Sequence, residues 1–598
     1  MRAPAWDAAS ALRYLRQPVH ASTLGAFRVL FATCMLWQAC IFWDVFDNLR
    51  RTKMVFPYAG LDVAPPCDPT VGGRLLWVIM GAGLATMLGA ATKLATAVLC
   101  ATFVYLFHIT EENHNNHYIL ICHVTFVASF IDWGRCHSID AAVARWLQRG
   151  RPNVHAEPTV PYYQLLLMQL LFTIPYFFGA VAKANEDWLL RAEPPKMWFS
   201  QRPAEGVLGP LYHTSWYPWF IAWGGFAFDL GISFILFSRP LKLPIGLPSV
   251  VFFNCMNKCM FNIGVFPVAM LASYTLFLSP EAPAKFVWRI RALLDHGGVA
   301  QTTDAFAYVG PRWHAFWFVP APPDVYANAK RHTGWVAKGV GGDVEALPPP
   351  LVSSDAAERP ALRKLFPLVF TLSFAVFHVA SPLRHFALYA PSPSWHEEGH
   401  IGAWHMMLRS KRGDIMLDFV SWEENGALQQ HHRVFPSYDE FLNNRQRRKL
   451  FSKPHAVLLY VQHMARMYRE AGRNLTAVYA TSCFALNNRA PAKLFVEGAD
   501  LLQWVHRYEA TWPLGVRTGV GSGGFLHPLP PVDSSEATAC DPLSVGGVPL
   551  SLRETLTMSS VHRKLHEEAG VEIFEDGDVV HVPTGSMMYT TRWHLPPR

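Results

Sequence analysis

The sequence predicts a membrane-embedded bundle of α-helices followed by a soluble α+β domain. Apolar residues make up 51% of the 598 residues and charged residues only 16%, a composition that is poor in charge for a soluble protein. Long apolar stretches recur through the first two thirds of the chain. From about residue 395, charged residues return and short helical and strand-like patterns alternate, as in an α+β domain.

About nine apolar stretches are long enough to span, or nearly span, the roughly 30 Å hydrocarbon core of a bilayer. They lie near residues 22–45, 74–90, 92–109, 117–133, 162–182, 215–238, 240–254, 259–279 and 362–381. If the N-terminus lies in the cytoplasm, most Lys and Arg residues of the loops fall inside, as the positive-inside rule requires. An odd number of spans then places the C-terminal domain on the extracytoplasmic side. We therefore expect an integral multi-pass protein of the endoplasmic reticulum of a eukaryote or the inner membrane of a bacterium.

Composition divides the chain into four predicted parts. They are a transmembrane catalytic domain (1–282), a cytoplasmic loop rich in Pro and Gly (283–360), the last transmembrane helix with a connector (361–394), and an extracytoplasmic soluble α+β domain (395–598). The end of the soluble domain, residues 571–593, alternates in strand fashion with turn residues at Asp576-Gly577 and at 583–585. This domain should therefore end in β-sheet.

The segment Tyr176–Trp188 contains the most unusual residue of the membrane part. Lys183 ends a long apolar run and is followed by Asn185, Glu186 and Asp187. An ionisable side chain at this place is costly unless it is paired, hydrated or neutral. Desolvation favours the neutral amine, and a neutral amine can act as a base. The alternative is a lysine that extends to the membrane surface from a helix end.

Two other polar clusters lie at the ends of apolar runs. The segment 113–117 (Asn-His-Asn-Asn-His) opens a span at the predicted outer interface, where unpaired polar groups cost several kcal/mol. A polar helix cap is the alternative explanation. Asn254 and Asn257 lie one turn apart and would face the same side of a helix. Hydrogen bonding between membrane helices is the alternative for this pair.

No metal and no nucleic acid are expected. Residues 396–400 (His-Glu-Glu-Gly-His) fit the H-E-x-x-H pattern of zinc proteases, which needs both histidines on one helix. The preceding Ser-Pro-Ser, together with Gly399 and Gly402, argues against a helix. The ten cysteines form no C-x-x-C pair. The net charge of +7 comes without a long basic block, so nothing points to a nucleic-acid partner.

These motifs together resemble the vitamin K-dependent γ-glutamyl carboxylase family, which has an HTTM-type membrane domain and a C-terminal soluble domain. The most specific stretch is 253–283, an apolar segment that runs into a Ser-Pro-Glu turn. Residues 115–118 (Asn-Asn-His-Tyr) are similar to the family's N-N-H motif, and 180–188 to the segment that carries its catalytic lysine. Blocks of the soluble part also follow the family's order: 404–409, 486–500 and 577–591.

The resemblance implies an enzyme that couples two reactions at the membrane. Vitamin K hydroquinone is oxidised by O₂ to the epoxide, and the strong base formed on the cofactor removes a γ-hydrogen from a protein glutamate. The carbanion then adds CO₂ to give γ-carboxyglutamate. The implied partners are a glutamate-containing protein or peptide, the lipid bilayer and the lipid quinol.

The resemblance also assigns roles to individual residues. Lys183 falls at the position of the base that deprotonates the hydroquinone, and His117 is the second catalytic residue. The implied cofactor-binding residues are Asn116, Asn254, Asn257, His385, Met406 and Met407. The implied substrate-binding residues are Trp404, Arg409, Asn487 and Arg489.

The sequence departs from the family pattern at several positions. Asn254 stands where a histidine is usual, so proton transfer there is lost although a hydrogen bond is still possible. Asn488 replaces an acidic residue, and Val496-Glu497 replaces an Asp-Pro pair. Vertebrate members join a first-loop cysteine to the soluble domain; Cys67 lies near that position, but the matching soluble helix has no cysteine, so this bridge is not expected.

Two alternative functions therefore stay open. The first is a quinol-epoxidising membrane enzyme that modifies another substrate. The second is a non-catalytic membrane protein that binds a quinone. The second alternative predicts that Lys183 tolerates replacement by arginine.

Overall fold

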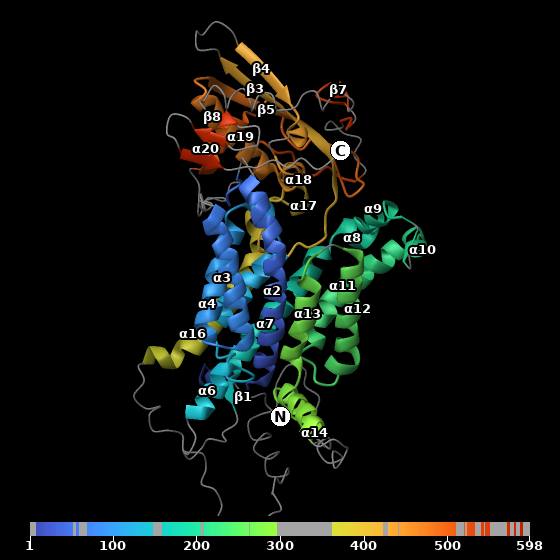
Figure 1. Ribbon diagram of the computed structural model, residues 1–598. Helices are drawn as coiled ribbons and strands as arrows, with labels where there is room; N and C mark the ends of the chain where they lie inside the picture. Colours follow the sequence, from blue (N-terminus) through green and yellow to red (C-terminus); the bar gives the residue numbers. More distant parts are fainter. Residues whose placement is uncertain are drawn as a thin grey trace, which may run out of the picture.

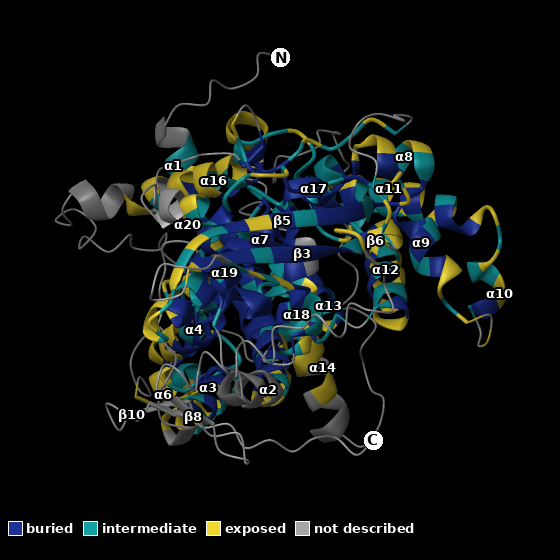
Figure 2. Cartoon of the chain, turned by 90° about the horizontal axis from the view of Figure 1, so that it is seen from above, coloured by how far each residue is buried: buried dark blue, intermediate teal, exposed yellow. Residues whose placement is uncertain are grey.

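The computed structural model places a helical bundle and a soluble domain end to end (Figure 1). It describes residues 8–51, 55–58, 69–147, 158–203, 205, 208–261, 263–295, 361–422, 429–439, 442–509, 519–520, 523–532, 540–542, 544–549, 571–573, 579–581 and 586–589. The bundle and the soluble domain each have their own large hydrophobic core. Figure 2 shows buried residues at the centre, in β3, α19 and α7, and exposed residues on the outer faces of α4, α6, α12 and α14.

Apolar helices make up the bundle. Its main helices are α2 (Ser22–Arg51), α3 (Pro69–Leu88), α4 (Thr92–His108), α5 (Asn116–Ala128), α7 (Tyr162–Lys183), α11 (Tyr217–Ile235), α12 (Leu247–Met260), α13 (Phe266–Ser273) and α16 (Ala361–Leu388). The remaining helical elements are α1 (Ala8–Arg16), η1 (Glu111–Asn113), α6 (Ile139–Leu147), α8 (Glu186–Arg191), α9 (Pro195–Ser200), α10 (Gly209–Tyr212), η2 (Lys242–Gly246), η3 (Tyr274–Phe277) and α14 (Ala282–Asp295). A small ribbon pairs β1 (Pro18–His20) with β2 (Thr159–Pro161).

The predicted apolar stretches form helices, but their predicted number as spans is not confirmed. Of the helices that the structure describes, four are long and apolar enough to cross a membrane: Ser22–Trp43 within α2, Val71–Leu88 within α3, and all of α7 and α11. Three apolar helices are shorter: Thr92–His108, Asn116–Ala128 and Phe266–Phe277. The predicted span 240–254 begins in the π-helical turn η2 and continues in α12 to Met260.

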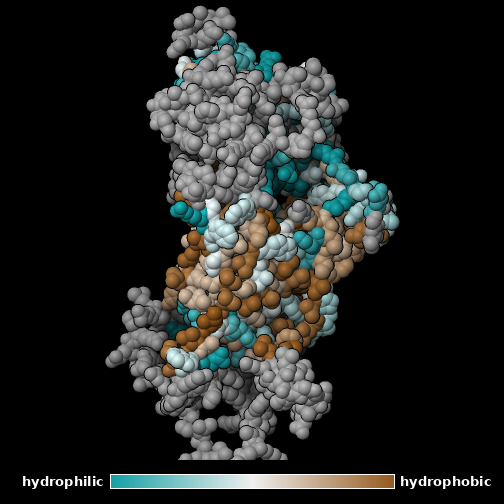
Figure 3. Space-filling model, viewed as in Figure 1, coloured by the Kyte–Doolittle hydropathy of each residue, from teal (hydrophilic) through white to brown (hydrophobic). Residues whose placement is uncertain are grey.

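The outer surface of the bundle is apolar, as expected for a membrane domain. Large side chains such as Trp77, Phe220, Trp223 and Phe252 are exposed there. Figure 3 shows a broad hydrophobic band over the helices, with hydrophilic residues gathered where the bundle meets the soluble domain. The elements α6 and α14 lie at the opposite end of the bundle from the soluble domain (Figure 1). This arrangement fits a membrane protein with an extracytoplasmic C-terminal domain.

The soluble domain is α+β, as the sequence predicts. Its central antiparallel sheet has the order β4-β3-β5, with β3 (Lys411–Trp422), β4 (Gln429–Val434) and β5 (Asn474–Leu486). The remaining elements are α17 (Pro393–His396), η5 (Pro436–Tyr438), α18 (Asn444–Ser452), α19 (Pro454–Glu470) and α20 (Leu501–Glu509). In α19, Val457, Tyr460, Val461, Met464 and Tyr468 recur at helical spacing and are buried in the core.

Strands near the C-terminus confirm the predicted sheet. The strands β8 (Val571–Ile573), β9 (Val579–His581) and β10 (Ser586–Tyr589) form an antiparallel sheet in the order β10-β9-β8. The turns predicted at residues 576–577 and 583–585 lie outside the described residues. Another ribbon pairs β6 (Ser544–Val545) with β7 (Val548–Pro549). The predicted loop 283–360 begins with helix α14 instead of a loop, and residues 296–360 lie outside the described part.

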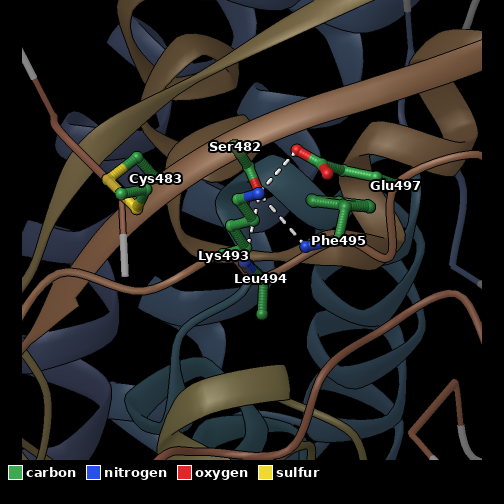
Figure 4. The surroundings of a disulfide bond; sticks show 7 residues. Ser482, Cys483, Lys493, Leu494, Phe495 and Glu497 are labelled. Carbon is green, nitrogen blue, oxygen red and sulfur yellow. Dashed lines mark hydrogen bonds and ion pairs between the residues drawn. A yellow bond between two sulfur atoms is a disulfide. The ribbon is translucent and has the colours of Figure 1, made fainter. Parts of the chain in front are cut away.

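A disulfide that the sequence did not predict joins Cys483 of β5 to Cys540, which lies 57 residues further along the chain. Figure 4 shows its surroundings, where the Ser482 hydroxyl accepts hydrogen bonds from the backbone N–H groups of Leu494 and Phe495. Disulfides persist in oxidising compartments, so this bond fits an extracytoplasmic domain. Cys67 lies outside the described residues.

Removing the disulfide should destabilise the soluble domain. We expect Cys483→Ser with Cys540→Ser to lower the melting temperature of the detergent-purified protein by roughly 5–15 °C, because an unfolded chain without this cross-link gains conformational entropy. Differential scanning fluorimetry under non-reducing conditions measures the change. The control is Cys255→Ser, which replaces an exposed free cysteine. Equal melting temperatures for the wild type and the double variant would contradict the expectation.

Candidate active site at the junction of the two domains

A buried ion pair lies at the end of the bundle that faces the soluble domain. Lys183, the last residue of α7, is 6% exposed, and Asp229 of α11 is 2% exposed. Lys183 Nζ lies 2.6 Å from Asp229 Oδ2 and 5.4 Å from the ring centroid of Trp188. The lysine therefore does not extend to the membrane surface. Sequence reasoning missed Asp229, although a lone carboxylate within an apolar stretch was a usable signal.

Apolar and aromatic side chains surround this ion pair. The rings of Phe228 and Phe253 stack with centroids 3.9 Å apart, and Tyr176 meets Phe228 edge to face at 5.4 Å. A side chain at Gly179 would meet Asp229 Oδ2 at 3.0 Å and Lys183 Nζ at 3.7 Å. Glycine at this position thus leaves room beside the two charged groups.

The soluble domain reaches the ion pair through the segment 404–409. Met406 Cε lies 3.4 Å from the place that a Gly179 Cβ would take, next to the Lys183 amine. Trp404 is 3% exposed and packs in the core of the bundle, with its ring near His123. Both Trp404 and Met407 have positive φ values, 57° and 60°, which cost free energy for residues with a side chain. Met407 is 40% exposed.

The segment 113–117, which includes the start of α5, contacts the segment 404–409 of the soluble domain. Asn115, and not Asn116, caps the helix, because its side chain accepts from the His117 N–H at 2.8 Å. Asn116 Nδ2 donates to the His405 carbonyl at 3.3 Å. The His117 ring stacks on Phe266 with centroids 4.0 Å apart. Asn116 therefore contacts the 404–407 segment, to which the other predicted cofactor residue, Met406, belongs.

The other predicted cofactor residues lie around the same junction. Asn254 is 1% exposed and its Nδ2 donates to the Val250 carbonyl of its own helix at 2.9 Å. Its side chain also lies near the Tyr176 hydroxyl. Asn257 is half-buried, one turn further along α12. His385 of α16 is buried and donates from Nδ1 to the Pro382 carbonyl at 2.7 Å.

A group of charged side chains fills the junction between bundle and soluble domain. This junction cluster consists of Glu111, Glu397, Arg409, Lys411, Lys449 and Lys453. Lys453 Nζ lies 2.6 Å from Glu111 Oε1, and Arg409 Nε lies 2.6 Å from Glu397 Oε1. Lys411 Nζ is 3.9 Å from Glu397 Oε1. Four cations thus face two carboxylates, which leaves the cluster with an excess of positive charge.

Burial, together with neighbouring charges, shifts the pKa values in the cluster. Burial, only partly offset by Glu397, lowers the pKa of Lys411 to about 7, and Arg409 and Lys453 contribute. Burial and the positive charges of Lys453 and Arg409 lower the pKa of Lys449 to about 7. For Glu111, burial opposes ionisation, but the neighbouring Lys453 ammonium, with a smaller contribution from His455, lowers the pKa to about 2. The cluster therefore changes its positive charge near neutral pH.

Two predicted substrate-binding residues form contacts between the domains instead. Arg489 Nη2 donates to Asp187 Oδ1 at 2.8 Å, and Asn487 Nδ2 donates to Asp187 Oδ2 at 3.1 Å. The adjacent Asn488 donates to Glu193 at 2.9 Å. These contacts attach the turn that follows β5 to the segment that follows Lys183. The buried Trp404 likewise packs in the bundle, so for Trp404, Asn487 and Arg489 the substrate role stays a prediction.

The H-E-x-x-H segment lacks the geometry of a zinc protease site. Helix α17 ends at His396, and Glu397 and Gly399 have positive φ values of 63° and 69°. His396 Nε2 bonds to the Ala390 carbonyl at 3.1 Å, whereas His400 Nε2 accepts from Arg409 Nη1 at 2.5 Å. The two histidines thus have different partners. Within the described part of the chain, no three His, Cys, Asp or Glu side chains are placed to hold a metal ion.

The fold and the site together define a class of protein: a multi-pass membrane protein whose buried ionic site lies where an extracytoplasmic domain meets the bundle. Two family models match the chain. One describes an HTTM domain and matches residues 16–281. The other describes the lumenal domain of vitamin K-dependent gamma-carboxylase and matches residues 363–516. No solved structure matches the chain. The two matches confirm the resemblance found in the sequence, and the chain belongs to the vitamin K-dependent gamma-carboxylase family.

Proposed function

We propose that this protein is a vitamin K-dependent γ-glutamyl carboxylase that converts protein glutamate to γ-carboxyglutamate. The observation that carries the proposal is the buried Lys183–Asp229 pair, 2.6 Å apart, at the end of the bundle where the soluble domain inserts Met406. When bound, vitamin K hydroquinone supplies the strong base that no side chain can supply. O₂ and CO₂ are the other reactants, and the products are the epoxide and γ-carboxyglutamate.

The residues around Lys183 fit a lipid hydroquinone. The stacked rings of Phe228 and Phe253 offer an apolar wall for a flat ring system. The Lys183 amine and the Asn116 side-chain amide offer hydrogen bonds to its hydroxyl groups. His117 lies on the Phe266 ring at the start of α5, close in sequence to Asn116. This combination of apolar walls with few polar groups is typical of a small-molecule site.

Lys183 is the proposed base that accepts a proton from a hydroquinone hydroxyl. The Nζ atom can accept this proton only after it has given up one of its own, and Asp229 Oδ2 lies within hydrogen-bond distance to take it. The pair therefore shares a proton between two buried heavy atoms. Burial also excludes water, which would otherwise quench a strong base formed at this place.

The junction cluster is the proposed binding site for the glutamate side chain. Its excess positive charge favours a carboxylate, and arginine and lysine are the side chains that bind one best. Arg409 lies three residues after Met406, so the cluster continues directly from the hydroquinone site.

Peptide binding should weaken as the pH rises above 7. Lys411 and Lys449 have pKa values of about 7 in the free protein. A bound carboxylate favours their protonated forms and therefore raises these pKa values. Above pH 7 the complex then binds more protons than the free protein, so binding takes up protons. We expect the Kd of a glutamate peptide to rise by about 3–10-fold per pH unit between 7 and 9. Isothermal titration calorimetry in detergent gives both Kd and the proton uptake.

The matched variants for this measurement are Lys449→Met and Lys493→Met. The first should weaken binding and flatten its pH dependence. The second removes a lysine that pairs with Glu497 at 2.9 Å, outside the cluster, and should leave both unchanged. A Kd that is constant from pH 6.5 to pH 9 would show that the cluster does not hold the carboxylate.

The main alternative is a quinol-epoxidising enzyme with another substrate, which the amide side chains at Asn254 and Asn488 favour. Asn254 cannot transfer a proton, and its Nδ2 is bonded within its own helix. One assay distinguishes the possibilities: purified protein with vitamin K hydroquinone, O₂, ¹⁴C-bicarbonate and a glutamate peptide. Epoxide together with fixed carbon supports the carboxylase. Epoxide alone supports the alternative, and neither product from folded protein supports a quinone-binding protein.

A further inference from the structure

His405 is buried at the junction with both ring nitrogens unused. It lies between Trp404 and Met406 and is 6% exposed. Among the described residues, neither Nδ1 nor Nε2 has a hydrogen-bond partner. Buried polar side chains almost always have at least one partner, because leaving them unpaired costs free energy. A histidine with two unused nitrogens therefore points to a ligand that completes its hydrogen bonds.

A second unused group lies beside it. Asn116 Nδ2 donates to the His405 carbonyl at 3.3 Å, but Asn116 Oδ1 is buried and has no partner in the part of the chain that the structure describes. The positive charge of Lys183 acts on His405, and Met406, the next residue, contacts the space beside Lys183. The unused nitrogens and the unused oxygen therefore belong to the surroundings of the Lys183–Asp229 pair.

Neighbouring histidines hold the His405 ring without occupying its nitrogens. The rings of His385 and His400 lie edge-on to it, with centroids at 4.5 Å and 5.4 Å. His385 Nδ1 is bonded to the Pro382 carbonyl, and His400 Nε2 to Arg409. Burial, His385 and Arg409 lower the pKa of His405 to about 3, so the ring is neutral at physiological pH. A neutral imidazole offers one N–H donor and one acceptor.

We propose that His405 is a ligand-binding residue of the hydroquinone site: its ring N–H donates to the hydroxyl oxygen opposite the one that faces Lys183, and Asn116 Oδ1 accepts from that hydroxyl. A para-hydroquinone carries two hydroxyl groups on opposite sides of one ring, and the junction offers two polar positions, Lys183 with Asp229 and His405 with Asn116. The inference rests on the proposed function, since it assumes that a hydroquinone occupies this site.

The test compares His405→Phe with His405→Gln in full-length protein. Binding of vitamin K hydroquinone under anaerobic conditions is followed by quenching of tryptophan fluorescence, and stability by the melting temperature without ligand. His405→Phe keeps a flat ring but loses the donor, so we expect Kd to rise about 5- to 10-fold. The melting temperature of this variant should stay equal or rise, because an unpaired buried polar group is removed. His405→Gln can still donate and should recover part of the affinity.

Each outcome decides a separate point. An unchanged Kd in His405→Phe would overturn the inference, as would a Kd that rises together with a lower melting temperature, which indicates a structural role. Failure of the wild-type protein to bind the hydroquinone at all would instead overturn the proposed function. Weaker binding with unchanged or higher stability, and partial rescue by glutamine, supports the role of His405.

Discussion

Replacing Lys183 with arginine should abolish epoxide formation while the protein stays folded. A guanidinium keeps the positive charge that faces Asp229 in the buried pair, but it does not lose its proton in a protein and cannot act as a base. Loss of a general base lowers rates by about 10²–10⁴-fold. Epoxide formation from vitamin K hydroquinone, measured by chromatography in detergent, checks the result.

The same variant separates the enzyme from a quinone-binding protein. A binding protein needs only the charge and volume at this position, so arginine would be tolerated and hydroquinone affinity kept within a few fold. The melting temperature must be measured beside the rate, because a misfolded variant is also inactive. A folded Lys183→Arg protein that still forms epoxide at more than a tenth of the wild-type rate would rule out Lys183 as the base.

The sequence contains enough information to predict the helices that form the bundle. Runs such as Tyr162–Lys183 and Tyr217–Ile235 are apolar over the length that a bilayer requires, and this property is local to each segment. Shorter apolar helices such as Asn116–Ala128 do not meet the same criterion alone. Their place in the bundle depends on neighbouring helices, so the number of spans could not be fixed from hydropathy.

The residues that complete the site could not be found by local pattern. Lys183 stood out because it ends an apolar run, but its partner Asp229 is 46 residues away and on another helix. Glu111 and Lys453, which join the two domains, are 342 residues apart. The pairing of Cys483 with Cys540 likewise depends on the packed sheet, since spacing alone does not determine connectivity.

The predicted substrate residues show why block resemblance is not enough to assign contacts. Trp404 and Arg409 belong to one short segment, but the first packs in the core of the bundle and the second pairs with Glu397 in the junction cluster. Positive φ values at Trp404 and Met407 turn the chain between these environments. His405, between the two environments, gave no sequence signal at all, because a single histidine in a soluble segment is unremarkable.

A double-mutant cycle on Lys183 and Asp229 should give a strong coupling in stability. Asp229→Leu leaves the Lys183 ammonium buried without its carboxylate, and removal of one partner of a buried pair costs about 3–5 kcal/mol. Lys183→Met should destabilise in the same way by leaving the carboxylate alone. The combined variant replaces both charges with apolar groups and should recover most of the lost stability, because no buried charge is left unpaired.

Stability in this cycle is measured by unfolding in detergent, and hydroquinone oxidation is measured on each variant. We expect the combined variant to be folded and inactive, which identifies the ion pair as a catalytic feature that is not required for the fold. The two single losses together should exceed the loss of the combined variant by about 4–8 kcal/mol. If the two single effects simply add, Lys183 and Asp229 do not interact as the 2.6 Å contact implies, and the proton shared between them cannot be part of the mechanism.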